Sequence, residues 1–143
     1  MTSIRDLMTS DVETVSPDQT AREAASFMLS ADTGAIPVCE GDRVVGMITD
    51  RDIAVRGVAE GKGPECSVRE LMSDDVVCIR EDDDVQSVAS MMSDAQVRRL
   101  PVLDGNDQLI GMISIGDLAR ESGDESAHQA LEGVSAHGGQ HQQ

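Results

Sequence analysis

Aromatic side chains are nearly absent from this sequence: Phe27 is the only one, and there is no tryptophan or tyrosine. Proteins that bind single-stranded nucleic acid stack the bases on aromatic rings, and this chain offers no such platform. Basic residues are also scarce, with 11 lysines and arginines against 27 acidic residues and a formal net charge of −16. Binding to DNA or RNA by counterion release needs the opposite charge. Nucleic acid is therefore excluded as a partner.

Long hydrophobic runs are absent as well. No apolar run approaches the roughly 18 residues that a membrane-spanning helix needs. The N-terminal stretch "MTSIRDLMTSD" lacks the basic and apolar regions of a signal peptide. We therefore expect no membrane partner, and we expect a soluble protein of the cytoplasm.

The cysteines are too few and too scattered to form a framework. Cys39, Cys66 and Cys78 are odd in number and contain no CxxC spacing. This pattern favours neither a set of disulfides nor a structural zinc site, so we expect no metal there. We expect the three side chains to act as small buried hydrophobes.

Lysine is the scarcest charged residue, with Lys62 as the single example beside ten arginines. Dense carboxylates and few lysines fit a high-salt cytosol, in which an acidic surface keeps proteins hydrated and apart. A GC-rich genome combined with an ordinary acidic surface explains the same composition. Both interpretations remain open from the sequence.

What the sequence does contain is an internal repeat. Residues 46–52 read "GMITDRD" and residues 111–117 read "GMISIGD". The similarity extends on both sides, because residues 4–41 align with 68–105 and, after the inserted Asn106, residues 42–54 align with 107–119. About nineteen of roughly fifty aligned positions are identical, which indicates a duplication. We expect repeat one at 4–58, a linker at 59–67, repeat two at 68–121 and a polar, disordered tail at 122–143.

Each repeat has the pattern of a β-α-β-β-α unit. The runs "ETVS" and "VCIR" predict short strands, and Ser16, Pro17 and Gln19 predict a helix start as N-cap, N1 and N3. Apolar residues at helical spacing predict the buried faces of two helices: Ala21, Ala24, Ala25, Met28 and Leu29 in repeat one, and Val85, Val88, Ala89 and Met92 in repeat two. The pairs "AIPVC"/"RVVGMIT" and "RLPVL"/"QLIGMIS" predict hairpins, and a further helix begins near Thr49 and near Ser114. The fold class is therefore α/β, with the two repeats packed about a pseudo-twofold axis.

At this point the chain resembles the CBS domain family in its tandem arrangement, often called a Bateman module, as a stand-alone protein. The segments that carry the resemblance are "IRDLMTSDVETVSPDQT", "GAIPVCEGDRVVGMITDRDI", "LMSDDVVCIREDDDV" and "QVRRLPVLDGNDQLIGMISIGDLAR". The resemblance implies clefts between the two repeats that bind AMP, ADP, ATP or S-adenosylmethionine. It implies no catalysis and no cofactor, and it implies a homodimer.

The same resemblance assigns the site residues. Ribose and phosphate contacts fall on Thr49, Asp52, Ser114 and Asp117. A carboxylate can accept two hydrogen bonds from a ribose diol, and the helix that follows points its first amides at an anion. The adenine slot falls on Val15, Ala35, Ile36, Pro37, Ile79, Leu100 and Pro101. The prolines suit edge strands, whose unpaired backbone groups could read the base.

A different interpretation of the repeated motif needs no ligand. Thr-x-x-Asp at a helix start is also a capping box, in which Thr49 caps the helix and Asp52 reaches back to the chain. Capping by the hydroxyl is compatible with ribose binding by the acid.

The basic residues differ between the repeats. Arg51 is replaced by Gly116 in repeat two, whereas Arg98 and Arg99 replace Gly34 and Ala35. We expect Arg51, Arg98 and Arg99 to contact phosphates, either from different sides or with only one strong site. The alternative for each is a surface or acid-paired side chain.

No catalytic arrangement of Ser, His and Asp or of Cys and His is discernible, so we expect no enzyme. His128, His137 and His141 all lie in the tail, where they could bind a metal only loosely. Two functions remain: a regulatory module that binds adenosine ligands and signals through a homodimer, and an interaction or dimerisation module with degenerate clefts. The sequence names no downstream protein partner.

Overall fold

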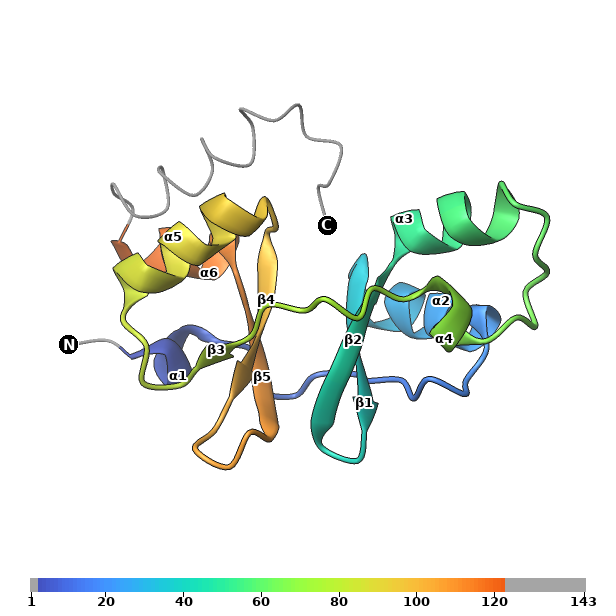
Figure 1. The fold of residues 1–143 in the computed structure, drawn as a ribbon. Coiled ribbons are helices and arrows are strands. Elements are labelled where there is room, and N and C mark those ends of the chain that lie inside the picture. Colours follow the sequence, from blue (N-terminus) through green and yellow to red (C-terminus); the bar gives the residue numbers. More distant parts are fainter. Residues whose placement is uncertain (1–2, 123–143) are drawn as a thin grey trace. The chain divides into compact units, whose positions relative to one another are not determined.

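A computed structural model describes residues 3–122 and shows a mixed fold of helices and strands (Figure 1). The chain divides into two compact units that do not follow the sequence repeats. We call residues 13–76 the continuous unit, and residues 3–12 together with 77–122 the split unit. Each unit combines most of one repeat with a short segment from the start of the other. The expected tail, from residue 123 onwards, lies outside the described residues.

The continuous unit contains a two-stranded sheet and four helical segments. In chain order these are α2 (Ala21–Ala31), β1 (Ala35–Glu40), β2 (Arg43–Thr49), α3 (Asp50–Asp52), the π-helix η1 (Ile53–Val58) and α4 (Val68–Leu71). The strand expected at "ETVS" is reduced to one parallel bridge between Val15 and Val38. The expected order of elements is otherwise present.

The split unit repeats this arrangement with a three-stranded sheet. Its elements are α1 (Ile4–Leu7), β3 (Ile79–Arg80), α5 (Val85–Ala95), β4 (Arg99–Leu103), β5 (Leu109–Ser114) and α6 (Ile115–Ser122). The strand order is β3-β4-β5, with β3 parallel and β5 antiparallel to β4. The expected hairpins and the helices that follow them are therefore confirmed in both units.

The start of the first long helix was predicted at the wrong residue. The N-cap of α2 is Thr20, which forms a capping box with Glu23, whereas Ser16 and Gln19 form a separate turn before it. The hydrogen bond from the Thr20 amide, and then those from the Gln19 and Thr20 side chains, lower the pKa of Glu23. The predicted helix start at Ser16 is therefore wrong by about one turn.

The N-termini of α2 and α4 meet and satisfy each other. The first two amides of α2, at Ala21 and Arg22, donate to the carbonyls of Cys66 and Pro64 at 2.9 and 3.0 Å. The first two amides of α4 donate in return to Gln19 and Pro17, at 2.8 and 2.9 Å. Helix ends need partners for these amides, and here the end of the expected linker supplies them. This tertiary pairing and the capping box of Thr20 and Glu23 together support the start of α2 at Ala21.

The buried faces of the two long helices were predicted in part. Ala21, Ala24 and Met28 are buried on α2, but Ala25 is exposed and Leu29 is 85% exposed. On α5, Val88, Ala89 and Met92 are fully buried and Val85 is half-buried. The apolar stripe of α2 is therefore narrower than its sequence indicates.

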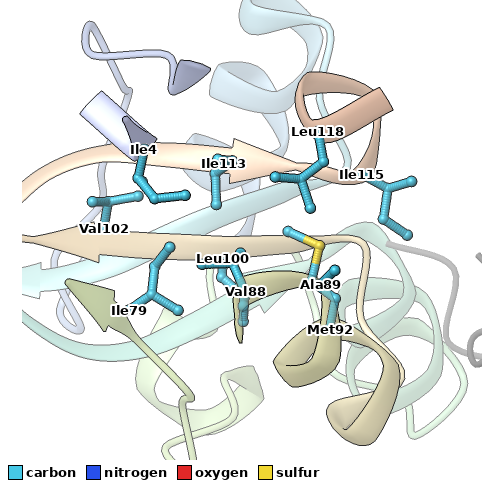
Figure 2. Close-up of a cluster of buried hydrophobic side chains, with 10 residues drawn as sticks. All are labelled: Ile4, Ile79, Val88, Ala89, Met92, Leu100, Val102, Ile113, Ile115 and Leu118. Carbon is cyan, nitrogen blue, oxygen red and sulfur yellow. The ribbon is translucent and has the colours of Figure 1, made fainter. Parts of the chain in front are cut away.

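Each unit has its own hydrophobic core. In the split unit the core side chains come from α1, all three strands, α5 and α6, as Figure 2 shows. In the continuous unit the core is built by Val15, α2, both strands and α4.

Cys39 is buried as expected, whereas Cys66 and Cys78 are only half-buried. Burial raises the pKa of the Cys78 thiol.

A glycine in each hairpin permits the closest packing in the fold. A Cβ atom built on Gly46 would lie 2.7 Å from the carbonyl oxygen of Ser73 and 2.8 Å from the sulfur of Met72. A Cβ on Gly111 would lie 2.7 Å from the oxygen of Thr9 and 2.6 Å from the sulfur of Met8. The "LMS" segment of repeat two thus packs on the hairpin of repeat one, and the "LMT" segment of repeat one packs on the hairpin of repeat two.

We expect Gly46→Ala and Gly111→Ala each to lower the free energy of unfolding by about 1–3 kcal/mol, because the new methyl group meets a backbone oxygen that cannot rotate away. Urea denaturation measures this. Gly105→Ala is the matched control, since nothing lies within 4 Å of the Cβ position there. Equal midpoints for all three variants would contradict this packing.

Candidate functional site

The first candidate site lies where β2 ends and α3 begins. The Thr49 hydroxyl accepts a hydrogen bond from the Asp52 amide at 3.0 Å, and Oδ2 of Asp52 accepts one from the Thr49 amide at 2.9 Å. The other carboxylate oxygen, Oδ1, lies 3.8 Å from Nε of Arg56. The Asp52 side chain is 16% exposed. The motif is therefore a complete capping box with one oxygen that makes only a long ion pair.

The second candidate site has the same geometry at the junction of β5 and α6. The Asp117 amide donates to the Ser114 hydroxyl at 3.1 Å, and the Ser114 amide donates to Oδ2 of Asp117 at 2.8 Å. Here Oδ1 accepts a 2.5 Å hydrogen bond from Arg120. The Asp117 side chain is only 8% exposed. The second acid is thus more deeply buried and more fully bonded than the first.

The capping interpretation of the repeated motif is confirmed at both sites. Each carboxylate oxygen has two lone pairs, so a capping acid keeps some capacity to accept a further hydrogen bond. Ribose binding by Asp52 and Asp117 therefore stays a prediction.

Sequence reasoning missed the arginines that pair with these acids. Arg56 follows Asp52 by one helical turn and also donates to the carbonyls of Leu71 and Met72, at 3.3 and 3.2 Å. Arg120 follows Asp117 in the same way. An arginine three or four residues after a helix-capping acid is a recognisable signal, because side chains at that spacing are neighbours on a helix.

Most of the side chains assigned to the adenine slot lie in the cores. Val15 and Ile36 belong to the core of the continuous unit, and Ile79 and Leu100 belong to the core of the split unit. Ala35, Pro37 and Pro101 are buried as well. Because these side chains are buried, a base could contact only those of their atoms that remain accessible at the edge of each core.

The expectation that the proline strands lie at sheet edges is wrong for Pro101. Its strand, β4, is the middle strand of three. A middle strand tolerates proline near an irregularity of the ladder, and the register shifts directly after Pro101, between Val102 and Leu103. The same shift occurs between Val38 and Cys39 after Pro37.

The arginines assigned to phosphate share an unusual property. Seven ion pairs join residues of the described chain, and each uses a different cation. Four of the eleven basic residues are left without an acidic partner among residues 3–122: Arg43, Arg51, Arg98 and Arg99. The acid-paired alternative for the three predicted arginines therefore finds no support within the described chain.

Arg98 carries a further unmet polar group. Its Nε atom is buried and has no hydrogen-bond partner in the described structure. A buried donor without a partner costs about 1–3 kcal/mol. The main chain at this position is engaged, because the Arg98 carbonyl accepts from the Ile115 amide at 2.9 Å.

Neither a metal-binding cluster nor a membrane-spanning helix is found within residues 3–122. Within residues 3–122, no group of three or more His, Cys, Asp or Glu side chains is placed to hold a metal ion. The three histidines fall outside the described residues. No helix of the described chain is both long and apolar enough to cross a bilayer.

Known proteins show clear similarity to this chain. The sequence profile of the CBS domain matches residues 4–57 and 68–124. CBS domain-containing protein YhcV of Bacillus subtilis is 43% identical over 136 residues, which cover 94% of this chain and 96% of that protein.

Two solved structures are similar in fold and sequence. Hypoxic Response Protein I, with two coordinated zinc ions, gives a TM-score of 0.76 at 36% identity and covers 85% of this chain and 99% of that one. The CBS domain pair of protein MJ0100, in complex with 5-methylthioadenosine and S-adenosyl-L-methionine, gives 0.76 at 27% identity, with coverage of 86% and 97%.

We expect Asp117→Ala to lower the free energy of unfolding by about 1–3 kcal/mol, because it removes an acceptor from the helix cap and a partner from Arg120. Asp52→Ala should cost less, since its ion pair is longer and its side chain more exposed. Chemical denaturation measures both. Asp42→Ala, at the exposed turn of the first hairpin, is the control. If Asp117→Ala is as stable as this control, the acid contributes nothing to capping.

Proposed function

The chain belongs to the CBS domain family, and on that premise we propose that it is a non-enzymatic regulator that binds adenosine-containing ligands. The candidate ligands are AMP, ADP, ATP and S-adenosylmethionine, with one site in each repeat. Binding changes the interaction of a homodimer with a further protein. No catalytic step is part of this function.

The observation that carries the proposal is the set of unpaired arginines. The chain has 27 acidic residues, so an arginine beside them would ordinarily find a partner. Three of the four arginines without one among residues 3–122 are Arg98 and Arg99, at the start of β4, and Arg51, in α3. An anionic ligand would supply the missing charge, and hydrogen bonds between charged groups are the stronger kind.

Strand register supports a site at each of these positions. Ala35 lies opposite Thr49 in the first hairpin, and Arg99 lies opposite Ser114 in the second. Directly opposed residues of an antiparallel pair project from the same face of the sheet. A ligand held by the hydroxyl of Ser114 would therefore lie within reach of Arg99.

The ribose of the ligand would be held by the capping acids. Oδ1 of Asp52 makes only a 3.8 Å ion pair, so it can accept from a ribose hydroxyl. The MJ0100 pair, which was solved with two adenosine derivatives, supports the adenosine class of ligand for this chain. The zinc ions of Hypoxic Response Protein I have no matching group of ligands among the described residues.

The second candidate function is an interaction module whose ligand sites are degenerate. It is favoured by apolar side chains at the surface of the continuous unit: Leu29 is 85% exposed and Val58 is 71% exposed. Such side chains suit a contact between protein chains. A homodimer is compatible with both functions, so only ligand binding separates them.

Calorimetric titration with AMP, ATP and S-adenosylmethionine tests the proposal. We expect at least one of them to bind, with up to two sites per chain, and the Asp52→Asn/Asp117→Asn double variant to lose binding while it still unfolds cooperatively. Asparagine keeps an acceptor for each cap, so the fold should survive. Asp42→Asn is the charge-matched control. An absence of binding by all three ligands would leave the interaction module as the better function.

Discrimination between bases and sugars tests the same site independently. We expect GMP to bind at least about tenfold more weakly than AMP, because the exocyclic amine of guanine would lack an acceptor at a cost of about 1–3 kcal/mol. The 2′-deoxy form of AMP should also bind more weakly, since it offers Asp52 and Asp117 one hydroxyl fewer. Equal affinities for the three nucleotides would contradict the assignment of these residues.

A further inference from the structure

The two candidate sites have the same backbone geometry but different charge. In both, the residue before the site strand accepts a 2.9 Å hydrogen bond from the first residue of the following helix: Gly34 accepts from Asp50, and Arg98 accepts from Ile115. The positions are therefore equivalent in space as well as in sequence. A glycine and an acid at the first site correspond to an arginine and an apolar residue at the second.

At the first site an acid occupies the space that an arginine occupies at the second. A Cβ atom on Gly34 would lie 2.9 Å from Oδ2 of Asp50, so the carboxylate stands directly over this glycine. The other oxygen of Asp50 accepts the Arg51 amide at 2.8 Å. The carboxylate thus lies at the start of α3 and adds a negative charge beside Arg51.

At the second site no acid takes this place. Ile115 stands where Asp50 stands in the first site, and Gly116 replaces Arg51. Arg98 and Arg99 have no acidic partner among the described residues, and Nε of Arg98 is buried without a hydrogen bond. The second site therefore presents two uncompensated guanidinium groups.

The local charges can be compared directly. The first site has two acids, Asp50 and Asp52, and two arginines, Arg51 and Arg56, so it is neutral. The second site has one acid, Asp117, and three arginines: Arg98, Arg99 and Arg120. Glu121 stands at the sequence position equivalent to Arg56, so over equivalent positions the second site is more positive by one charge.

We propose that the two sites select adenosine ligands by charge: the second site takes a di- or triphosphate, and the first takes a ligand with little or no negative charge, such as adenosine or a sulfonium derivative. This inference rests on the proposed function. It assigns different ligands to sites that the repeated motif alone makes equivalent. One charge near a ligand with several phosphate charges is expected to change the relative affinity for that polyphosphate by about tenfold, even with strong solvent screening.

ATP and adenosine are the probes, because they share base and ribose and differ only in phosphate. Titration calorimetry uses the full chain as Asp52→Asn, which leaves the second site, and as Asp117→Asn, which leaves the first. We expect the ratio of ATP affinity to adenosine affinity to be about tenfold larger for Asp52→Asn than for Asp117→Asn. Equal ratios would overturn the inference and leave the proposed function intact. Failure of ATP and adenosine to bind the unaltered chain would overturn the inference, and the proposed function would fall with it only if AMP and S-adenosylmethionine also fail to bind.

Variants of the charged residues around the sites provide a second test of the inference, which does not require a substitution of the buried Asp117. In the otherwise unaltered chain, Asp50→Asn should strengthen ATP binding at the weaker ATP site, and Asp42→Asn should not. Replacing Arg98 and Arg99 together by Gln should weaken ATP binding at least about tenfold and leave adenosine binding unchanged. Arg43→Gln, which removes an unpaired arginine at the far end of the first hairpin, controls for net charge. Equal effects of the site and control variants would overturn the inference.

Discussion

The fold depends on one contact that occurs twice, in which a short segment after α1 or α4 approaches a glycine in a hairpin. The amide and carbonyl of Met47 exchange 2.9 Å hydrogen bonds with Ser73, and those of Met112 exchange bonds of 2.9 and 2.8 Å with Thr9. These bonds form only because Gly46 and Gly111, next to the two methionines, leave room for the approaching backbone. Each hairpin thereby gains a further strand-like neighbour, which comes from the start of the other repeat.

The candidate sites follow from this arrangement. The hydrogen bonds to Ser73 and Thr9 fix the second strand of each hairpin in place. The resulting register places Thr49 opposite Ala35 and Ser114 opposite Arg99. The strand then passes directly into a helix whose cap is the repeated hydroxyl and acid. The repeat thus fixes a common frame, and the residues that differ within this frame set the charge of each site. The proposed assignment of different ligands to the two sites rests on those differences as much as on the shared motif.

The sequence predicted local features well and tertiary ones poorly. The four hairpin strands and the caps at Thr49 and Ser114 follow from alternation, glycine turns and capping patterns, all of which lie within a few residues. The true N-cap of α2 was missed although Thr20 and Glu23 form a local capping box, because Ser16 and Gln19 offer a competing pattern one turn earlier. The exposure of Leu29 and the core positions of the slot residues depend on packing that no local pattern contains.

The crossed segments also constrain how such a chain could arise. A half-length ancestor with a single repeat would have its "LM" segment at one end of the sequence and its glycine hairpin at the other. In the present fold those two parts never pack within the same repeat, since residues 3–12 join the split unit and residues 68–76 join the continuous unit. Such an ancestor would complete its sheet by exchanging arms with a second copy, as in a domain-swapped dimer. Duplication and fusion would then convert an association between molecules into a connection within one chain, and the two halves would become free to diverge in charge.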